Sequence, residues 1–204
     1  MTERTTGLEA LIVVDVQTAH VRGDRAVPGA ARLLERTGWL MERARRSGAL
    51  VVRVQNDGAA GADDEPYTPG WELHHPVEAG SGDPVVRKTR ADGFDGTSLG
   101  GLLADAGVRS IAVCGVMSEM CVQATVRTAL ALGFRVVLPH DAHATHNIPA
   151  APGISEEIPA ASVSRVAAWA LSGQAEVTVP AADLVFTAPA GPAQPGGAAG
   201  ERTP

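Results

Sequence analysis

Short, mainly apolar runs recur along this chain. The first, at residues 10–15, ends in Asp15, and the others cover 49–54, 84–88 and 110–116. Continuous apolar runs of this length are typical of strands that are buried on both faces of a parallel sheet. Because helix-length segments separate most of them, the pattern predicts parallel βαβ units with right-handed crossovers.

The remaining periodic segments complete this picture. The predicted helices lie at about 29–47, 98–106, 121–132 and 160–171, and further strands at 134–139 and 177–179. Only 3% of the residues are aromatic, so the core has to be built from Ala, Val and Leu through helix-on-sheet packing. The predicted fold class is therefore α/β, a three-layer α/β/α sandwich with a mainly parallel central sheet of about six strands.

Length and composition favour one globular domain. The chain has 204 residues, of which 45% are hydrophobic and 20% charged, and we expect a single domain over residues 1–186. From 187 to 204 the composition turns to Ala, Gly and Pro, which predicts a disordered tail. The polar segment 56–83 is too long for a simple connection, and we expect it to be either a functional lid or a disordered loop.

Charge and cysteine usage narrow the possible partners and the compartment. The formal net charge is -6 and no dense Lys/Arg block occurs, which argues against nucleic acid. No apolar run approaches ~18 residues and no charged-then-apolar leader begins the chain, so we expect no membrane partner. Two cysteines without CxxC or HExxH spacing indicate a reducing, cytoplasmic location without a zinc site.

Cys121 stands between the fourth apolar run and the following helix. With Ser118 as the N-cap, the thiol would lie in the first helical turn, where unpaired backbone N–H groups favour an anion. Such a position lowers a thiol pKa and makes a nucleophile. The competing interpretation is a small buried hydrophobe, as we expect for Cys114 inside the strand pattern.

Three reactive residue types follow three predicted strands: Asp15, Lys88 and Cys121. In an open parallel sheet the carboxyl ends of the strands form the crevice where ligands bind. An acid, a cation and a thiol gathered at this edge would supply a nucleophile, its activator and a charge balancer. Taken singly, a strand-end Asp often caps a loop and a strand-end Lys is usually solvated.

Three motifs carry a resemblance to a known family. They are LIVVDVQ at 11–17, VVRKTRADGFDGTSL at 85–99 and CGVMSEMCVQATVRTALALGFRVVLPHDA at 114–142. Over about residues 10–179 the chain resembles the isochorismatase-like cysteine hydrolases. The resemblance implies an Asp15–Lys88–Cys121 catalytic triad and a cis peptide between Val116 and Met117. It also implies an oxyanion hole formed by the backbone amides of Met117 and Cys121.

The same resemblance implies a chemistry. Members that carry the cysteine cleave C–N bonds through a thioester, and they include ureido and carbamoyl amidases and enzymes that open the lactam of streptothricin antibiotics. Nicotinamidases of the family hold a metal through an Asp/His cluster after the second strand, where this chain has Asn56, Asp57 and Gly58. We therefore expect no metal and no cofactor.

Six further residues are candidates for substrate binding because they follow strand ends or lie in the long loop. They are Gln17, His20, Trp71, Phe94, Val116 and His143. Trp71 could stack on a substrate, and it could equally pin the long loop against the body.

Other interpretations stay open. They are a nicotinamidase-type activity, an isochorismatase activity, a catalytically silent small-molecule-binding protein on the same fold, and a redox-responsive thiol protein. The expected partner is a small-molecule substrate, and the resemblance implies a homodimer or homotetramer.

Overall fold

The fold was analysed in a computed structural model that describes residues 7–77 and 82–191. The strands are β1 (Ala10–Val14), β2 (Leu50–Asn56), β3 (Val85–Lys88), β4 (Ser110–Val116), β5 (Arg135–Val137) and β6 (His143–Ala144). The helices are α1 (Thr18–Val21), α2 (Ala30–Arg46), α3 (Leu99–Asp105), α4 (Gln123–Ala131) and α5 (Ala160–Trp169), with the π-helical turn η1 (Ser118–Val122) and the 3-10 turn η2 (Ala181–Asp183).

The six strands form one parallel sheet. Its order is β3-β2-β1-β4-β5, and β6 pairs with β4 beyond the last residues of β5. The chain builds outward from β1 to β3 on one side, then crosses over to β4 on the other side of β1. This reversal between β1 and β4 is the point where open α/β sheets leave a crevice for ligands. The predicted fold class is confirmed.

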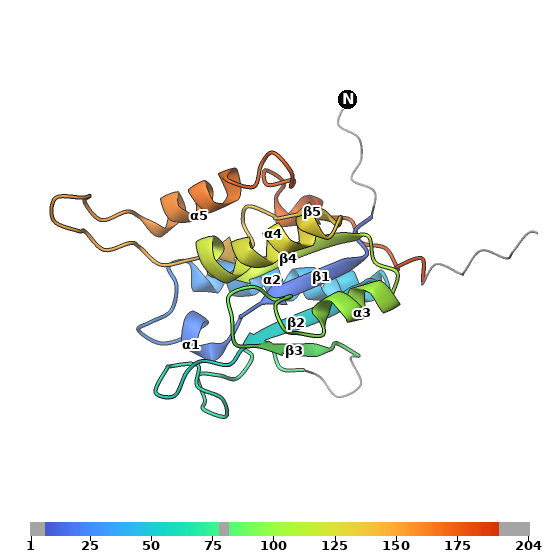
Figure 1. The fold of residues 1–204 in the computed structure, drawn as a ribbon, viewed down its shortest axis with the longest axis horizontal. Coiled ribbons are helices and arrows are strands. Elements are labelled where there is room, and N and C mark those ends of the chain that lie inside the picture. The colour runs from blue at the N-terminus through green and yellow to red at the C-terminus, as the bar shows by residue number, and fades with distance from the viewer. Residues whose placement is uncertain (1–6, 78–81, 192–204) are drawn as a thin grey trace, which may run out of the picture.

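Alternating side chains of the central strands face two separate cores. Leu11 and Val13 of β1 pack on the side of α2, whereas Ile12 and Val14 face α3 and α4. Figure 1 shows these helices on opposite faces of the sheet. Because β1 is covered on both faces, all five of its residues are buried, which explains its unbroken apolar sequence.

Several predicted elements need correction. Residues 177–179 do not form an edge strand; the nearest pairing is an isolated bridge between Val137 and Glu176. The predicted helix at 121–132 divides into η1 and α4, and it starts three residues earlier than expected. The short elements α1 and β6 were not predicted, because runs of four and two residues carry no measurable periodicity.

The long polar segment folds against the carboxyl edge of the sheet over its described residues. Backbone N–H groups of Thr18 and Ala19 donate to the carbonyls of Glu72 and Gly70, at 2.9 and 2.8 Å. The Ala/Gly/Pro-rich tail falls mostly outside the described residues. Its described part, 187–191, contains no helix or strand. No helix among the described residues is long and apolar enough to span a bilayer.

Gly115 lets β1 and β4 approach each other just before the site. Its φ is 123°, and an added Cβ would lie 1.9 Å from the carbonyl oxygen of Val14. That separation is much shorter than the sum of the van der Waals radii, and the backbone oxygen cannot rotate to relieve the clash. The close approach of the two central strands at this level therefore requires glycine.

We expect Gly115→Ala to lower the free energy of unfolding by more than about 2 kcal/mol, because it adds a backbone clash to a disfavoured φ. The matched control is Gly101→Ala in α3, where an added Cβ meets nothing within 4 Å. That change should be neutral or stabilise the protein by up to about 1 kcal/mol. Urea unfolding followed by circular dichroism measures both. Equal stabilities of Gly115→Ala and the wild type would contradict the argument.

Candidate active site

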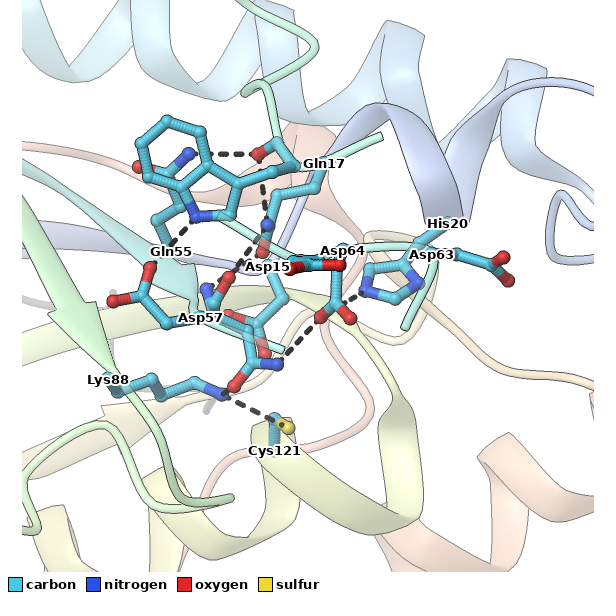
Figure 2. A network of polar contacts seen from close by, with 12 residues as sticks. Asp15, Gln17, His20, Gln55, Asp57, Asp63, Asp64, Lys88 and Cys121 are labelled. Carbon is cyan, nitrogen blue, oxygen red and sulfur yellow. Dashed lines mark hydrogen bonds and ion pairs between the residues drawn. The ribbon is translucent and has the colours of Figure 1, made fainter. Parts of the chain in front are cut away.

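Three side chains meet where β1, β3 and β4 end. The ammonium Nζ of Lys88 lies 2.8 Å from Oδ2 of Asp15 and donates a 3.4 Å hydrogen bond to Sγ of Cys121 (Figure 2). The side chains of Lys88 and Asp15 are almost wholly buried, whereas Cys121 is half-buried. The structure thus brings together the acid, the cation and the thiol that sequence analysis placed at one sheet edge.

Each of the three residues is positioned by the end of its strand. Asp15 follows β1 with a φ of 51°, a left-handed conformation that Asp adopts more readily than most residues. Its backbone N–H donates to the carbonyl of Val54 in β2, at 2.9 Å. Lys88 is the last residue of β3, and its side chain spans β2 to reach Asp15. Cys121 lies in η1, directly beyond β4.

The turn that carries Cys121 differs from the expected helix start. The N-cap of this turn is Met117 and not Ser118; Met117 is extended and its side chain makes no capping hydrogen bond. Instead the backbone N–H of Val122 donates to the carbonyl of Met117 in a wide π-type turn, at 3.2 Å. The side chain of Ser118 turns inward and contacts Nδ1 of His143, at 2.8 Å. The peptide between Val116 and Met117 is cis, as predicted.

Burial dominates the electrostatics of the site. The pKa of the Cys121 thiol is raised to about 12, mostly by burial and next by the neighbouring Asp15 carboxylate, while Lys88 opposes both effects. The expectation that the turn lowers this pKa was therefore wrong. Burial also raises the pKa of Asp15, although Lys88 opposes that shift. Two acids share one cation, so a single proton between them leaves the site electrically balanced.

A chain of polar side chains, which sequence analysis missed, leads from Lys88 to the surface. Lys88 Nζ donates to Oδ1 of Asn56, and Nδ2 of Asn56 donates to Oδ2 of Asp64, at 3.1 and 2.7 Å (Figure 2). The same oxygen of Asp64 lies 3.6 Å from Nε2 of His20. Asn56 ends β2, so the strand-end argument that selected Asp15 and Lys88 could have found it too.

Gln17 and Trp71 hold the long loop in place. The Gln17 amide donates to the carbonyls of Asn56 and Trp71 and accepts the backbone N–H of Asn56. Nε1 of Trp71 donates to Asp57, at 2.8 Å, and its ring packs against Tyr67. The structure therefore favours the interpretation in which Trp71 pins the loop, and it gives Gln17 the same bracing position.

Of the other three predicted binding residues, Val116 and His143 are buried and Phe94 is partly buried. Val116 is fully buried, and the ring of Phe94 packs 6.3 Å from that of Phe134. His143 is buried in β6 behind Ser118. Among the six candidates, His20 reaches the network around Lys88 through Asp64, and Gln17 reaches it through the backbone of Asn56.

No group of three or more His, Cys, Asp or Glu in the described part of the chain could hold a metal ion. His20 and Asp64 are neighbours, but the third position of that cluster is the amide of Asn56, which is already bound to Lys88. Of the polar atoms around the thiol, Oδ1 of Asp15 is buried and has no hydrogen-bond partner among the described residues.

Comparison with known proteins agrees with this geometry. The model of the isochorismatase domain matches residues 9–157. Two proteins of Streptomyces noursei, both named streptothricin hydrolase, are 64% and 61% identical to this chain over 89% and 91% of its length. The chain spans 66% of the first relative, which is just under two thirds, and 74% of the second.

A solved structure of an isochorismatase from Pseudomonas putida KT2440 is similar as well. It has a TM-score of 0.79 and 29% identity, with 87% of this chain and 90% of the other chain covered. The sheet order, the residues at the strand ends and the domain match lead to the same conclusion. This chain belongs to the isochorismatase-domain family of hydrolases.

Proposed function

We propose that this protein is a cysteine hydrolase that cleaves a non-peptide C–N bond, and that its substrate is the lactam of a streptothricin-type antibiotic. The contact of Lys88 with both Asp15 and Cys121 carries the proposal, because it places a cation where a thiolate would form. The two relatives named streptothricin hydrolase support the substrate. Neither a metal nor a cofactor takes part.

In the first half of the reaction, Asp15 accepts the proton of the Cys121 thiol. Its raised pKa makes it a stronger base than an ordinary carboxylate, and Lys88 stabilises the thiolate that forms. The sulfur attacks the carbonyl carbon, and the C=O electrons move onto oxygen. We assign the stabilisation of this oxyanion to the backbone amides of Met117 and Cys121, a contribution that is typically about 3–4 kcal/mol per donor.

In the second half, the tetrahedral intermediate collapses. The C–N bond breaks, and protonated Asp15 gives its proton to the leaving nitrogen. The acyl group is then a thioester on Cys121. Asp15 takes a proton from water, the resulting hydroxide attacks the thioester, and Cys121 leaves as a thiolate that recovers the proton. Asp15, Lys88 and Cys121 return to their starting charges.

The proposal extends to the domain, the cellular compartment and the oligomeric state. We place the catalytic unit in one domain over residues 1–186, working in the cytoplasm as a homodimer or homotetramer. Val166 and Trp169 support self-association, because both are large apolar side chains that α5 exposes. The alternatives of nicotinamidase-type or isochorismatase activity lack a comparable supporting observation.

We expect the wild-type protein to add one water to streptothricin and release no ammonia, because the amine of an opened lactam stays attached to the product. Cys121→Ala should lower this rate by at least about 10⁴-fold while the fold persists. Cys114→Ala is the matched control, since that thiol is buried in β4 and the variant should lose stability but not turnover. Mass spectrometry of the product measures the reaction.

Two outcomes would contradict the proposal in different ways. Turnover by Cys121→Ala at the wild-type rate would exclude the thiol as the nucleophile. Inactivity of the wild type on streptothricin, together with ammonia release from carbamoyl or ureido acids, would retain the thiol mechanism and reject the lactam as substrate. Inactivity on every amide-type compound would favour a silent binding protein.

Alkylation of Cys121 tests the charge assignment separately from turnover. Only the thiolate reacts with iodoacetamide, so the wild-type rate should be low at pH 8 and rise with pH toward the thiol pKa of about 12. Asp15→Asn removes a negative charge that raises this pKa, and alkylation at pH 8 should become about tenfold faster or more. Lys88→Met removes the opposing cation and should slow it.

Both variants should nevertheless lose hydrolysis, because Asp15 also transfers protons and Lys88 also holds the thiolate. Because the two variants should change the alkylation rate in opposite directions, the experiment distinguishes a charge role from unfolding of the protein. Slower alkylation in Asp15→Asn, or faster alkylation in Lys88→Met, would overturn the charge assignment. Cys114 is an internal control, because burial raises the pKa of its thiol to about 12 and the side chain is fully buried.

A further inference from the structure

The ammonium group of Lys88 can donate three hydrogen bonds, and three acceptors lie within reach of it. Two belong to the proposed mechanism: Oδ2 of Asp15 at 2.8 Å and Sγ of Cys121 at 3.4 Å. The third is Oδ1 of Asn56, at 3.1 Å. Because Lys88 is almost wholly buried, water does not readily replace a lost acceptor. The place of the ammonium beside the thiol therefore depends on Asn56 as well as on Asp15.

The side-chain amide of Asn56 suits Lys88 in only one of its two orientations. An ammonium only donates hydrogen bonds, so it requires the amide oxygen and opposes the amide NH₂ group. On the other side, Nδ2 of Asn56 donates to Oδ2 of Asp64, at 2.7 Å. A carboxylate only accepts, so it requires the NH₂ group. The two neighbours select the same orientation, and turning the amide by 180° would make both contacts unfavourable.

The turn after β2 holds Asp64 in this place. Asp64 is buried, and its backbone carbonyl accepts the N–H of Gly58, at 3.0 Å. A Cβ added at Gly58 would lie 2.1 Å from Oδ1 of Asp64. The turn can therefore close on this carboxylate only because residue 58 is a glycine.

Asp64 belongs to the long loop, and other parts of that loop are attached to the same edge of the sheet. Nε2 of Gln17 donates to the carbonyls of Asn56 and Trp71, at 2.9 and 3.0 Å. Nε2 of His20 lies 3.6 Å from Oδ2 of Asp64 (Figure 2). If the loop left this edge it would take Asp64 with it, and the amide of Asn56 would be free to turn. The place of the loop and the contacts of Lys88 are thus linked through one amide.

We propose that Asp64 is a positioning residue, which fixes the amide of Asn56 and so holds the Lys88 ammonium against the thiol of Cys121. This inference rests on the proposed role of Cys121 as nucleophile. It differs in sign from a direct electrostatic role. The negative charge of Asp64 alone would disfavour a thiolate, whereas holding Lys88 in place favours one.

Asp64→Asn tests this inference, because the new side chain has the same shape but offers Asn56 an NH₂ group as readily as an oxygen. Alkylation of Cys121 by iodoacetamide at pH 9 should become about threefold slower or more, since the thiolate loses contact with Lys88. The matched control is Asp63→Asn, which removes the same charge from the same loop, where Asp63 pairs with Arg25. The control should change the rate by less than about twofold.

Two further variants separate positioning from a general effect on the fold. Asn56→Ala should slow alkylation by itself, and Asp64→Asn should then have no additional effect, because the amide through which Asp64 acts is missing. Gly58→Ala should slow alkylation as Asp64→Asn does, because its Cβ displaces the carboxylate. Circular dichroism of each variant checks that the fold persists.

Alkylation of Asp64→Asn at the wild-type rate or faster would overturn the inference. Additive effects of Asp64→Asn and Asn56→Ala would overturn it as well, because they would mean that the two residues act independently. Alkylation needs no substrate, so neither outcome depends on whether streptothricin is hydrolysed. Failure of the proposed function would appear in a different measurement, as turnover by Cys121→Ala.

Discussion

The burial of one ammonium group between two acids is the constraint on which this site depends. Lys88 contacts both Asp15 and Cys121 and is shielded from water, so each acid is costly to ionise without it. Because burial raises the pKa of both acids, the resting site keeps one proton between them. Catalysis in this account moves that proton instead of creating a free thiolate in advance.

The rest of the fold supplies the geometry for this arrangement. The sheet reverses its order between β1 and β4, which sets Asp15 and Cys121 on adjacent strand ends, and Gly115 permits the close approach of those strands. Asn56 then fixes the Lys88 ammonium from the side of β2. The long loop is hydrogen-bonded to the same edge, so the polar network and the strand ends are directly connected.

Much of this could be predicted from the sequence, because buried strands leave uninterrupted apolar runs and their ends point to one edge. That logic located Asp15, Lys88 and Cys121, and it would have located Asn56 if applied to β2. It could not reveal β6 or η1, which are too short for a periodic signal. It also gave the wrong direction for the Cys121 pKa, since burial depends on packing from distant segments that local position does not show.

Acid quenching of the protein during turnover of streptothricin, followed by mass spectrometry, tests the central claim most directly. In an opened lactam the leaving amine stays attached, so the account predicts an adduct on Cys121 with the mass of the whole substrate. In the proposed mechanism, Lys88 supplies the charge and Asp15 the proton that this intermediate needs. Turnover without any adduct on Cys121, under conditions in which breakdown of the thioester limits the rate, would contradict the account.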